Sequence, residues 1–374
     1  MKIIHCADLH LDSNMTSNLT KEKAKERKSE LLMTFNKMIQ FADENEVDAI
    51  LMAGDLFDKK KVTKTALNTV KQAIVCNPQI EFYYLQGNHD VDSFITCFED
   101  IPKNLKLFSS AWTSYEAGCN DDEKDMSDFV VTVSGVELNN ENSGQIYDSL
   151  VLNNDNFNIV MLHGQESEHS NKDKTEVINI NRLKNKGIDY LALGHIHSYK
   201  ESSLDSRGVY CYSGCLEGRG FDECGEHGFV LIDIDRQTRK FTRKFIPIAK
   251  RNIFTLSIDV SGCNTTMDIV NRVDDELEKN TYPESSLMKF VLVGEVDALC
   301  EMDFDYLIKE YENRFYYLKI YNETKLYVDY NDFALDASLK GEFVRTVMGD
   351  DKLDEDEKAD IIRFGIQALA GEEV

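Results

Sequence analysis

Five short apolar runs in the N-terminal two thirds of the chain are each followed directly by polar residues that can bind metal ions. The runs are residues 2–7, 47–53, 80–85, 157–162 and 188–193. Short and nearly continuous apolar runs are typical of strands buried on both faces of a layered sheet. Charged segments with helical spacing, 21–43 and 62–75, separate the first three runs. This alternation predicts an α/β fold, a layered sandwich of β-sheets flanked by helices.

The residues that follow these runs carry carboxylate, imidazole and amide groups, most of them beside a glycine. They are Asp8-Leu9-His10, Gly54-Asp55, Gly87-Asn88-His89-Asp90, His163-Gly164 and Gly194-His195-Ile196-His197. Because sites assemble at the carboxyl ends of strands in an open α/β sheet, we expect the segments to meet at one edge of the sheet. Five of the eight histidines fall in these segments. Because each of these histidines follows an apolar run, they are better explained as one site than as five unrelated structural histidines.

The donor atoms indicate which ions such a site would hold. Imidazole nitrogen combined with carboxylate and amide oxygen suits divalent ions such as Mn²⁺ or Fe²⁺, and the lack of thiolate argues against structural zinc. The nine cysteines include no C-x-x-C pair, which fits reduced thiols in a reducing compartment. Cys211, Cys215 and Cys224 lie close together in sequence. Ordinary packing explains these three cysteines better than a zinc site does, because a structural zinc site needs four ligands in paired spacing.

These motifs match the calcineurin-like metallophosphoesterase superfamily, and the chain most resembles its SbcD-type DNA repair exonucleases, including the shorter YhaO-like members. The segments that carry the closer resemblance are Lys2 to Leu11, Gly54 to Asp58, Tyr212 to Cys215, and Arg219 to Phe229. The resemblance covers about residues 1–250, and its motifs are more specific for the superfamily than for the exonuclease branch.

The chain departs from its relatives at two places. Relatives commonly have Pro-Gly-Ser where this chain has Ser213-Gly214-Cys215. Some relatives also carry a histidine at the position of Asp58, to which we therefore assign no catalytic role. Neither difference affects a residue implied as a metal ligand, so the departures concern substrate positioning.

The resemblance implies a centre of two divalent ions, expected to be Mn²⁺. The residues implied for one ion are Asp8, His10, Asp55 and His197, and those for the other are Asp55, Asn88, His163 and His195, with Asp55 bridging. His89 is similar to the family's histidine that assists at the scissile phosphate without binding metal. Asp90 resembles the residue that orients that histidine. Two ions close together polarise a phosphoryl oxygen, and an imidazole beside them stabilises charge or donates a proton.

The charge of the chain is unevenly distributed. The net charge is −25, and residues 252–374, with 12 Lys/Arg and 28 Asp/Glu, account for −16 of it. By contrast, residues 236–251 contain seven basic residues and no acidic one. Such a stripe is the kind of feature that meets phosphates, although taken alone it is better explained as the solvated face of an edge strand. The candidate substrate-binding residues are Arg219, Arg239, Lys240, Arg243 and Lys244.

The remaining runs predict how the first domain closes and where a second unit begins. Residues 209–213, 229–234 and 240–246 are expected to be antiparallel strands, and after Pro247 strand and helix segments alternate as a small βαβαβ-like unit. We assign residues 1–250 to a nuclease domain, 251–345 to a small α+β capping domain, and 346–374 to a C-terminal helical segment.

The resemblance implies that the second domain caps the active site and that C-terminal helices engage an SbcC-like coiled-coil ATPase. Ile361, Phe364, Ile366 and Leu369 would supply such a face, or else pack on their own domain. A homodimer is a further expectation. No run approaches the ~18–20 apolar residues of a membrane helix, and the N-terminus lacks the shape of a signal peptide, so we expect a cytoplasmic protein without membrane association.

Three classes of function stay open at this point. The leading interpretation is a Mn²⁺-dependent exonuclease subunit that hydrolyses phosphodiester bonds at DNA ends in a repair complex. The second is another hydrolase of the superfamily, acting on small phosphodiesters, nucleotides or phosphoproteins. The third is a non-catalytic subunit that keeps the fold for DNA or partner binding, against which the complete ligand set argues.

Overall fold

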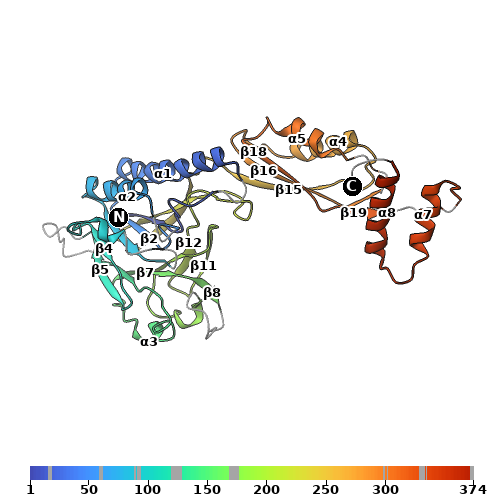
Figure 1. The fold of residues 1–374 in the computed structure, drawn as a ribbon. Coiled ribbons are helices and arrows are strands. Elements are labelled where there is room, and N and C mark those ends of the chain that lie inside the picture. The colour runs from blue at the N-terminus through green and yellow to red at the C-terminus, as the bar shows by residue number, and fades with distance from the viewer. Residues whose placement is uncertain are drawn as a thin grey trace. The chain divides into compact units, whose positions relative to one another are not determined.

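The computed structural model describes residues 1–15, 19–58, 62–87, 90, 94–118, 129–167, 177–297, 300, 302–327, 333 and 335–370. The chain divides into two compact units, Met1–Asn252 and Ile253–Val374 (Figure 1). Within the described ranges, none of the helices has the length and apolar character needed to cross a membrane.

Two six-stranded sheets form the middle of the first unit, with orders β14-β13-β1-β2-β3-β4 and β11-β12-β10-β7-β6-β5. The first contains β1 (Lys2–Cys6), β2 (Ala49–Ala53), β3 (Glu81–Leu85), β4 (Leu105–Leu107), β13 (Gly228–Ile234) and β14 (Phe241–Pro247). The second contains β5 (Thr113–Ala117), β6 (Val131–Gly135), β7 (Phe157–His163), β10 (Tyr190–Gly194), β11 (Lys200–Ser203) and β12 (Val209–Tyr212). The central strands of both sheets run parallel.

One predicted strand direction is correct on only one side of the strand. We expected residues 209–213 to be antiparallel, but β12 runs parallel to β10 and is antiparallel only to β11. The reason is that the short edge strand β11 precedes β12 and forms a hairpin with it, so that β12 returns alongside β10 in the same direction as that strand. The other two predicted antiparallel strands, β13 and β14, are confirmed.

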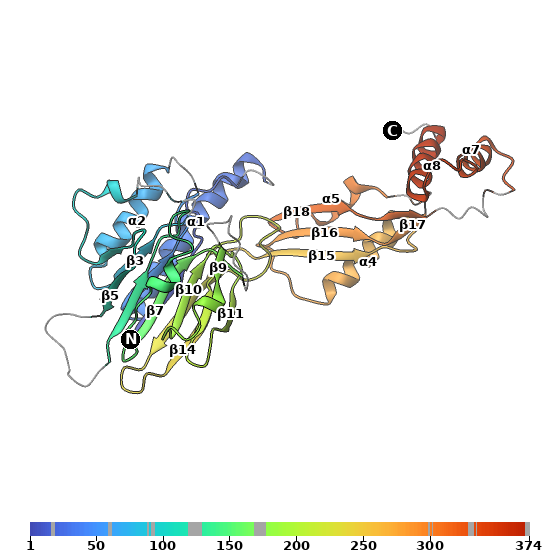
Figure 2. The same cartoon turned by 90° about the horizontal axis from the view of Figure 1, so that it is seen from below.

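Apolar residues fill the space between the two sheets and cover both outer faces. The inner layer includes Ile3 and Leu51 from one sheet and Ile159 and Ala192 from the other. Helices α1 (Lys21–Glu44) and α2 (Lys64–Cys76) cover the outer face of the first sheet (Figure 2). A third apolar cluster covers the outer face of the second sheet. The central strands are therefore buried on both faces, which confirms the predicted layered α/β sandwich.

A buried ionic cluster fastens α1 to the last residues of the first unit. Arg27 donates hydrogen bonds to the carboxylates of Glu30 and Glu217. Glu30 also accepts two bonds from Nε of Arg251. Burial alone would raise the pKa of Glu30, but Arg251, Lys250 and Arg27 lower it to about 2. The cluster thus joins the helix to the segment that contains Glu217.

Replacing Arg27 with methionine should lower the free energy of unfolding of the first unit by about 3 kcal/mol or more, because Glu217 and Glu30 would then be buried with fewer cations. Urea unfolding at pH 7 measures the change. The control is Lys25→Met on the exposed side of the same helix, which should change stability by no more than about 0.5 kcal/mol. Equal shifts in the two variants would contradict a stabilising role for the cluster.

The second unit is built on a parallel sheet of order β15-β16-β18. Its strands are β15 (Ile253–Asp259), β16 (Leu287–Val293) and β18 (Tyr317–Asn322), and helices α4 (Thr266–Glu278) and α5 (Phe304–Tyr311) connect them. Both helices pack on one face of the sheet. This is the βαβαβ arrangement that the sequence predicts, whereas its role as a cap stays a prediction.

Among the described residues, two helices follow the second sheet. They are α7 (Leu339–Met348), which the sequence did not predict, and α8 (Glu355–Ala370), which contains the predicted amphipathic helix. The two pack together through Val344, Val347, Ile362 and Ile366. A short parallel pair, β17 (Glu295–Asp297) with β19 (Lys325–Tyr327), precedes them. Within the first unit, β8 (Gln165–Ser167) pairs with β9 (Val177–Asn179) in the same way.

Candidate metal centre

The carboxyl ends of strands from both sheets of the first unit deliver polar side chains to one place. Asp8 follows β1 and Asp55 follows β2, both in the first sheet, while His163 ends β7 and His195 follows β10 in the second. We expected the ligands to meet at the edge of a single sheet. They come from two facing sheets because the parallel strands that carry them are divided between the layers of the sandwich.

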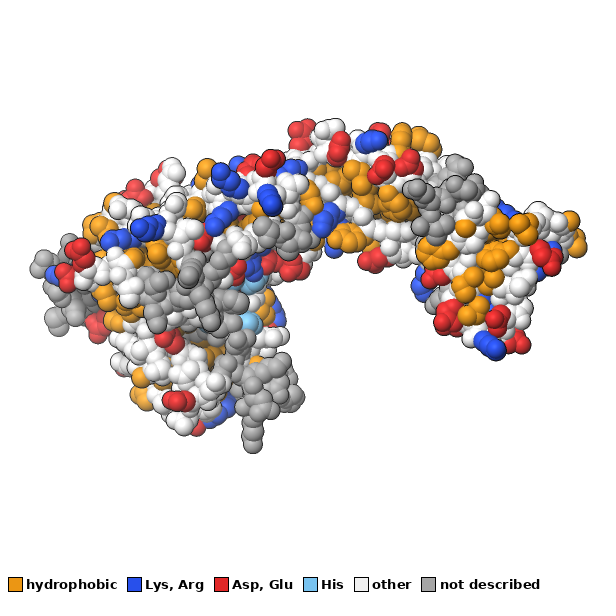
Figure 3. Space-filling model, in the orientation of Figure 1, with side chains coloured by type: hydrophobic (Ala, Val, Ile, Leu, Met, Phe, Trp, Pro, Cys, Tyr) orange, Lys and Arg blue, Asp and Glu red, His pale blue; other side chains and the backbone are white. Residues whose placement is uncertain are grey.

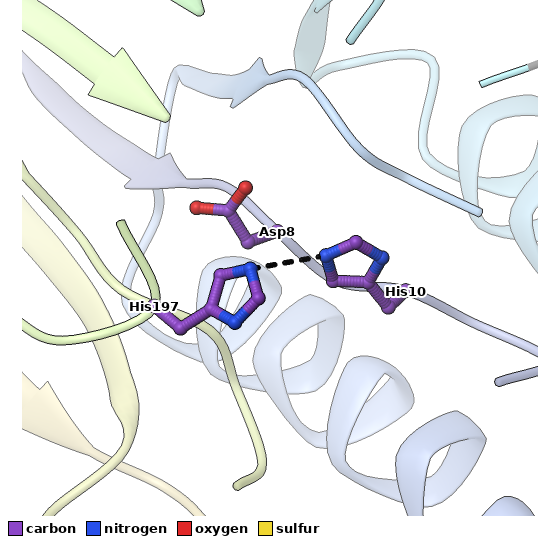
Figure 4. A group of neighbouring side chains, drawn as sticks. All are labelled: Asp8, His10 and His197. Carbon is purple, nitrogen blue, oxygen red and sulfur yellow. Dashed lines mark hydrogen bonds between the residues drawn. The ribbon is translucent and has the colours of Figure 1, made fainter. Parts of the chain in front are cut away.

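Two groups of three side chains have ligand atoms within 4.8 Å of one another. One group is Asp8, His10 and His197 (Figure 4), and the other is Asp8, Asp55 and His163. Oδ2 of Asp55 lies 3.4 Å from Nε2 of His163 and 3.8 Å from Nε2 of His10. Asp8 thus belongs to both groups, and Asp55 of the second group also lies near His10 of the first. The structure brings together five of the seven predicted ligands in this way, and their assignment to individual ions stays a prediction.

The backbone at this centre adopts a conformation that non-glycine residues rarely enter. Asp8, His10, Asp55 and His195 have φ values of 52°, 43°, 52° and 100°. Such strain costs of order 1–3 kcal/mol per residue and clusters at functional sites. At Gly54 (φ 93°) a Cβ atom would lie 2.1 Å from Nδ1 of His163. Glycine is needed there for the imidazole to approach.

The three imidazoles of the two groups are oriented alike. Nδ1 of His163 lies 2.9 Å from the carbonyl oxygen of Ala53, and Nδ1 of His197 lies 2.6 Å from Oε1 of Glu223. Nδ1 of His10 lies 3.2 Å from Oδ1 of Asp58. Because the nearest partner of each Nδ1 is an acceptor, Nδ1 carries the proton and Nε2 presents its lone pair to the centre. Nη2 of Arg219 also lies 3.1 Å from Nδ1 of His197, farther away than the oxygen of Glu223.

The facing nitrogens test whether the residues fit a metal. Nε2 of His10 and Nε2 of His197 lie 3.3 Å apart, as the dashed line in Figure 4 shows. Two lone pairs at this distance repel unless a shared cation offsets the repulsion. Histidine ligands of metals are held in the same manner, with the second ring nitrogen bonded to a carboxylate or a carbonyl group. The donor set therefore fits divalent metal ions, held by imidazole nitrogen and carboxylate oxygen.

Burial and mutual charge shift the pKa values at the centre. Burial raises the pKa of Asp8, although the neighbouring imidazoles oppose the shift. Burial disfavours the charged form of His163, but its bond to Asp55 and the charge of Asp8 outweigh this and raise the pKa to about 9. Since metal ligands must be deprotonated, a bound ion would displace these protons.

The other predicted site residues lie beside the two groups or outside the described residues. The backbone N–H of His195 donates to both carboxylate oxygens of Asp8 at 2.9 Å, and its ring lies edge-on to that of His163. The buried carboxylate of Asp90 accepts bonds from the backbone N–H groups of Phe57 and Gly87, and burial raises its pKa to about 6. Asn88 and His89 lie outside the described residues, so their roles stay predictions.

The basic stripe runs away from this centre. Arg243 of β14 lies opposite Ile232, and Ile232 lies opposite Ile3 near the amino end of β1, whereas Asp8 follows the carboxyl end of that strand. Residues 239 and 240 precede β14 and therefore lie farther still along the same direction. The register thus places Arg239, Lys240 and Arg243 toward the end of the sheet opposite the candidate ligands, whereas Lys250 and Arg251 follow the other end of β14.

Two of the four candidate phosphate-binding residues of the stripe also have partners within the protein. Arg243 donates hydrogen bonds to both carboxylate oxygens of Glu201. Arg239 donates to the carbonyl oxygen of Asn156 at 2.6 Å. Phosphate contact by Arg239, Lys240, Arg243 and Lys244 stays a prediction, which these intramolecular bonds do not favour.

Two carboxylates that the sequence analysis left without a role contact the candidate ligands. Glu223 accepts a hydrogen bond from the imidazole of His197, and Oδ1 of Asp58 lies 3.2 Å from Nδ1 of His10. The available signal was their position inside the two recognised motifs, at Gly54 to Asp58 and Arg219 to Glu223. Neither candidate metal group among the described residues contains a cysteine, which leaves Cys211 and Cys215 as buried packing residues.

The first 199 residues match the calcineurin-like phosphoesterase family. The uncharacterized metallophosphoesterase YhaO of Bacillus subtilis (strain 168) is 29% identical over 63% of this chain, a match that spans 57% of that protein's length. The DNA double-strand break repair protein Mre11 of Saccharolobus solfataricus is 24% identical, with 100% of this chain and 96% of that protein covered. The SbcD component of the SbcCD nuclease of Staphylococcus saprophyticus is 24% identical over 66% of this chain and 69% of its own length.

These comparisons confirm the resemblance drawn from the motifs. The family match covers more than half of the 374 residues. It contains both groups of candidate ligands, which strands of two sheets place together at their carboxyl ends. The chain therefore belongs to the calcineurin-like phosphoesterase family.

Proposed function

We propose that this protein is a metal-dependent DNA exonuclease subunit that hydrolyses phosphodiester bonds at DNA ends. The observation that carries the proposal is the pair of ligand groups that share Asp8, with the Nε2 atoms of three oriented imidazoles directed at one centre. The names of the relatives, a double-strand break repair protein and a nuclease subunit, support DNA as the substrate class. The imidazole-rich donor set supports Mn²⁺ as the ion.

In this proposal the residues of the chain hold the centre and move protons around it. Two bound divalent ions would polarise the phosphoryl group and lower the pKa of a nearby water molecule. Asp8 and Asp55 provide the anionic ligands, and the backbone N–H of His195 fixes the carboxylate of Asp8. His89 donates a proton to the leaving oxygen or stabilises its charge, and Asp90 orients that imidazole.

The main alternative is a phosphodiesterase or phosphatase of the same family that acts on nucleotides or phosphoproteins. It would use the same metal centre, so the ligand geometry does not distinguish it from a nuclease. The relatives named as DNA repair proteins favour the nuclease. A non-catalytic subunit is disfavoured because backbone strain costs free energy and clusters at functional sites. The strained residues and the oriented imidazoles lie together at the candidate metal centre.

Mn²⁺ should support degradation of end-labelled DNA far better than Mg²⁺, because Mg²⁺ prefers oxygen ligands and retains its waters. The measurement compares linear DNA, covalently closed DNA and a small chromogenic phosphodiester in each metal. Asp8→Asn is the control for a contaminating nuclease, since it removes the carboxylate that both ligand groups share. Equal rates in the two metals would count against the assignment, and hydrolysis of the small ester without cleavage of DNA would favour the alternative.

The proposed partner is a coiled-coil ATPase similar to SbcC, bound through the C-terminal helices. On α8, Ile361, Phe364 and Leu369 are 38%, 45% and 46% exposed, whereas Ile366 is buried against α7. The predicted face therefore lacks Ile366 but keeps its other three members at the surface. Figure 3 shows hydrophobic side chains gathered over these helices. The capping role of the second unit, a homodimer and a cytoplasmic location belong to the same proposal.

A further inference from the structure

We propose that Asp58, Arg219 and Glu223 form a clamp that positions the imidazoles of His10 and His197 for one metal ion, and that Arg219 acts on this centre rather than on the substrate. The inference rests on the proposed metal centre. It assigns a positioning role to Asp58, which stands where some relatives carry a histidine, and gives Arg219 a different role from the phosphate contact predicted from sequence.

Glu223 is the firmly held half of the clamp. The residue is only 6% exposed, and its Oε1 lies 2.6 Å from Nδ1 of His197. The backbone N–H of Arg219 donates to the other carboxylate oxygen at 2.7 Å. The carbonyl oxygen of Glu223 accepts from the buried imidazole of His227 at 2.8 Å. Side chain and backbone are thus both fixed, so the carboxylate can set the rotation of the His197 ring.

Asp58 plays the same part for the second imidazole. Its Oδ1 lies 3.2 Å from Nδ1 of His10. Its Oδ2 accepts a hydrogen bond from the hydroxyl group of Ser13 at 2.9 Å. The two imidazoles of one ligand group therefore each have a carboxylate behind them, and their Nε2 atoms face each other. His163, in the other group, is held by a backbone carbonyl instead.

Arg219 joins the two carboxylates. Its Nη2 donates to Oε1 of Glu223 at 3.0 Å and its Nε lies 3.2 Å from the same oxygen. Its Nη1 lies 3.5 Å from Oδ1 of Asp58. A planar guanidinium group can bridge two carboxylates in this way, whereas an ammonium group has no such fixed geometry. Its donors are directed at protein groups, the two carboxylates and Nδ1 of His197, which lies 3.1 Å from Nη2. This argues against a primary role in binding phosphate.

Charge and geometry predict opposite effects when Arg219 is changed. A positive charge close to the centre repels a bound cation, so Arg219→Met should tighten metal binding if charge alone matters. If the clamp matters, the same change frees the two carboxylates to move and metal binding weakens. Arg219→Lys keeps the positive charge but loses the planar guanidinium group that can bridge two carboxylates. If charge alone matters, Arg219→Lys should leave the Mn²⁺ affinity unchanged. If the clamp matters, it should lower that affinity.

The experiment measures Mn²⁺ binding to the full chain by equilibrium dialysis, without DNA, so that substrate contact does not enter. Removing a partner of a ligating histidine typically costs 10–100-fold in metal affinity. We expect each of four variants to lower the affinity for one Mn²⁺ ion by about 10-fold or more and to leave binding of the other ion unchanged. The variants are Glu223→Gln, Asp58→Asn, Arg219→Met and Arg219→Lys. The retained ion is the one that His163 would hold.

The control removes a matched carboxylate at the other end of β10. Asp189 is 8% exposed and accepts two bonds from Arg207 at 2.9 and 2.7 Å. Asp189→Asn should lower the thermal stability of the metal-free protein, because Arg207 loses a charged partner, without changing Mn²⁺ affinity. Clamp variants that bind Mn²⁺ as tightly as the wild type, or more tightly, would overturn the clamp alone. A wild-type chain that binds no Mn²⁺ would overturn the metal centre and the clamp together.

Discussion

Replacing Asp55 with asparagine should remove bound metal and DNA cleavage together. The side chain is 2% exposed, and its Oδ2 reaches the Nε2 atoms of His163 and His10, which belong to different ligand groups. Two divalent ions ~3.5–4 Å apart repel each other strongly, and a carboxylate between them offsets that repulsion. Because metal ions supply several kcal/mol of transition-state stabilisation, the rate should fall by ~10³-fold or more.

The test measures metal content per chain by elemental analysis beside the rate of DNA cleavage in Mn²⁺. Asp189→Asn serves again as the control, since it makes the same near-isosteric change in a buried carboxylate remote from the candidate ligands. That variant should keep its metal. An Asp55→Asn variant that stays loaded and active would refute the two-metal interpretation itself.

The positions of the candidate ligands could be predicted because local signals define them. An apolar run gives a strand, and the residue after it lies at the carboxyl end of that strand, as at Asp8, Asp55 and His163. The periodicity of a buried strand does not say which strand lies beside it. The division of these strands between two sheets was therefore out of reach, as was the parallel direction of β12.

The contacts behind the ligands could not be predicted for a different reason. Glu223 reaches His197 across 26 positions, and Arg219 approaches Asp58 across a far larger separation in sequence. A charged residue carries no pattern that names its partner, so each of these pairs is set by the fold alone. The basic stripe shows the same limit, because a run of like charges does not reveal that Arg243 is bonded to Glu201.

His89→Ser should lower the rate of DNA cleavage by ~10²–10⁴-fold and leave the metal content unchanged. In the proposed mechanism this imidazole donates a proton to the leaving oxygen or stabilises its charge, and it is not among the implied ligands. His163→Asn is the contrasting variant, because His163 lies in a ligand group and its loss should reduce both metal and rate. Loss of metal from His89→Ser would mean that His89 is a ligand.

The two ways in which His89 would assist can be separated with a second substrate. A nitrophenyl phosphodiester has a leaving group that departs without a proton, whereas the sugar oxygen of DNA needs one. If His89 is a proton donor, His89→Ser should slow DNA cleavage much more than hydrolysis of the nitrophenyl ester. If it stabilises charge on the phosphoryl group, both substrates should slow by a similar factor, because that charge develops in either reaction. An unchanged rate on DNA would remove His89 from the mechanism.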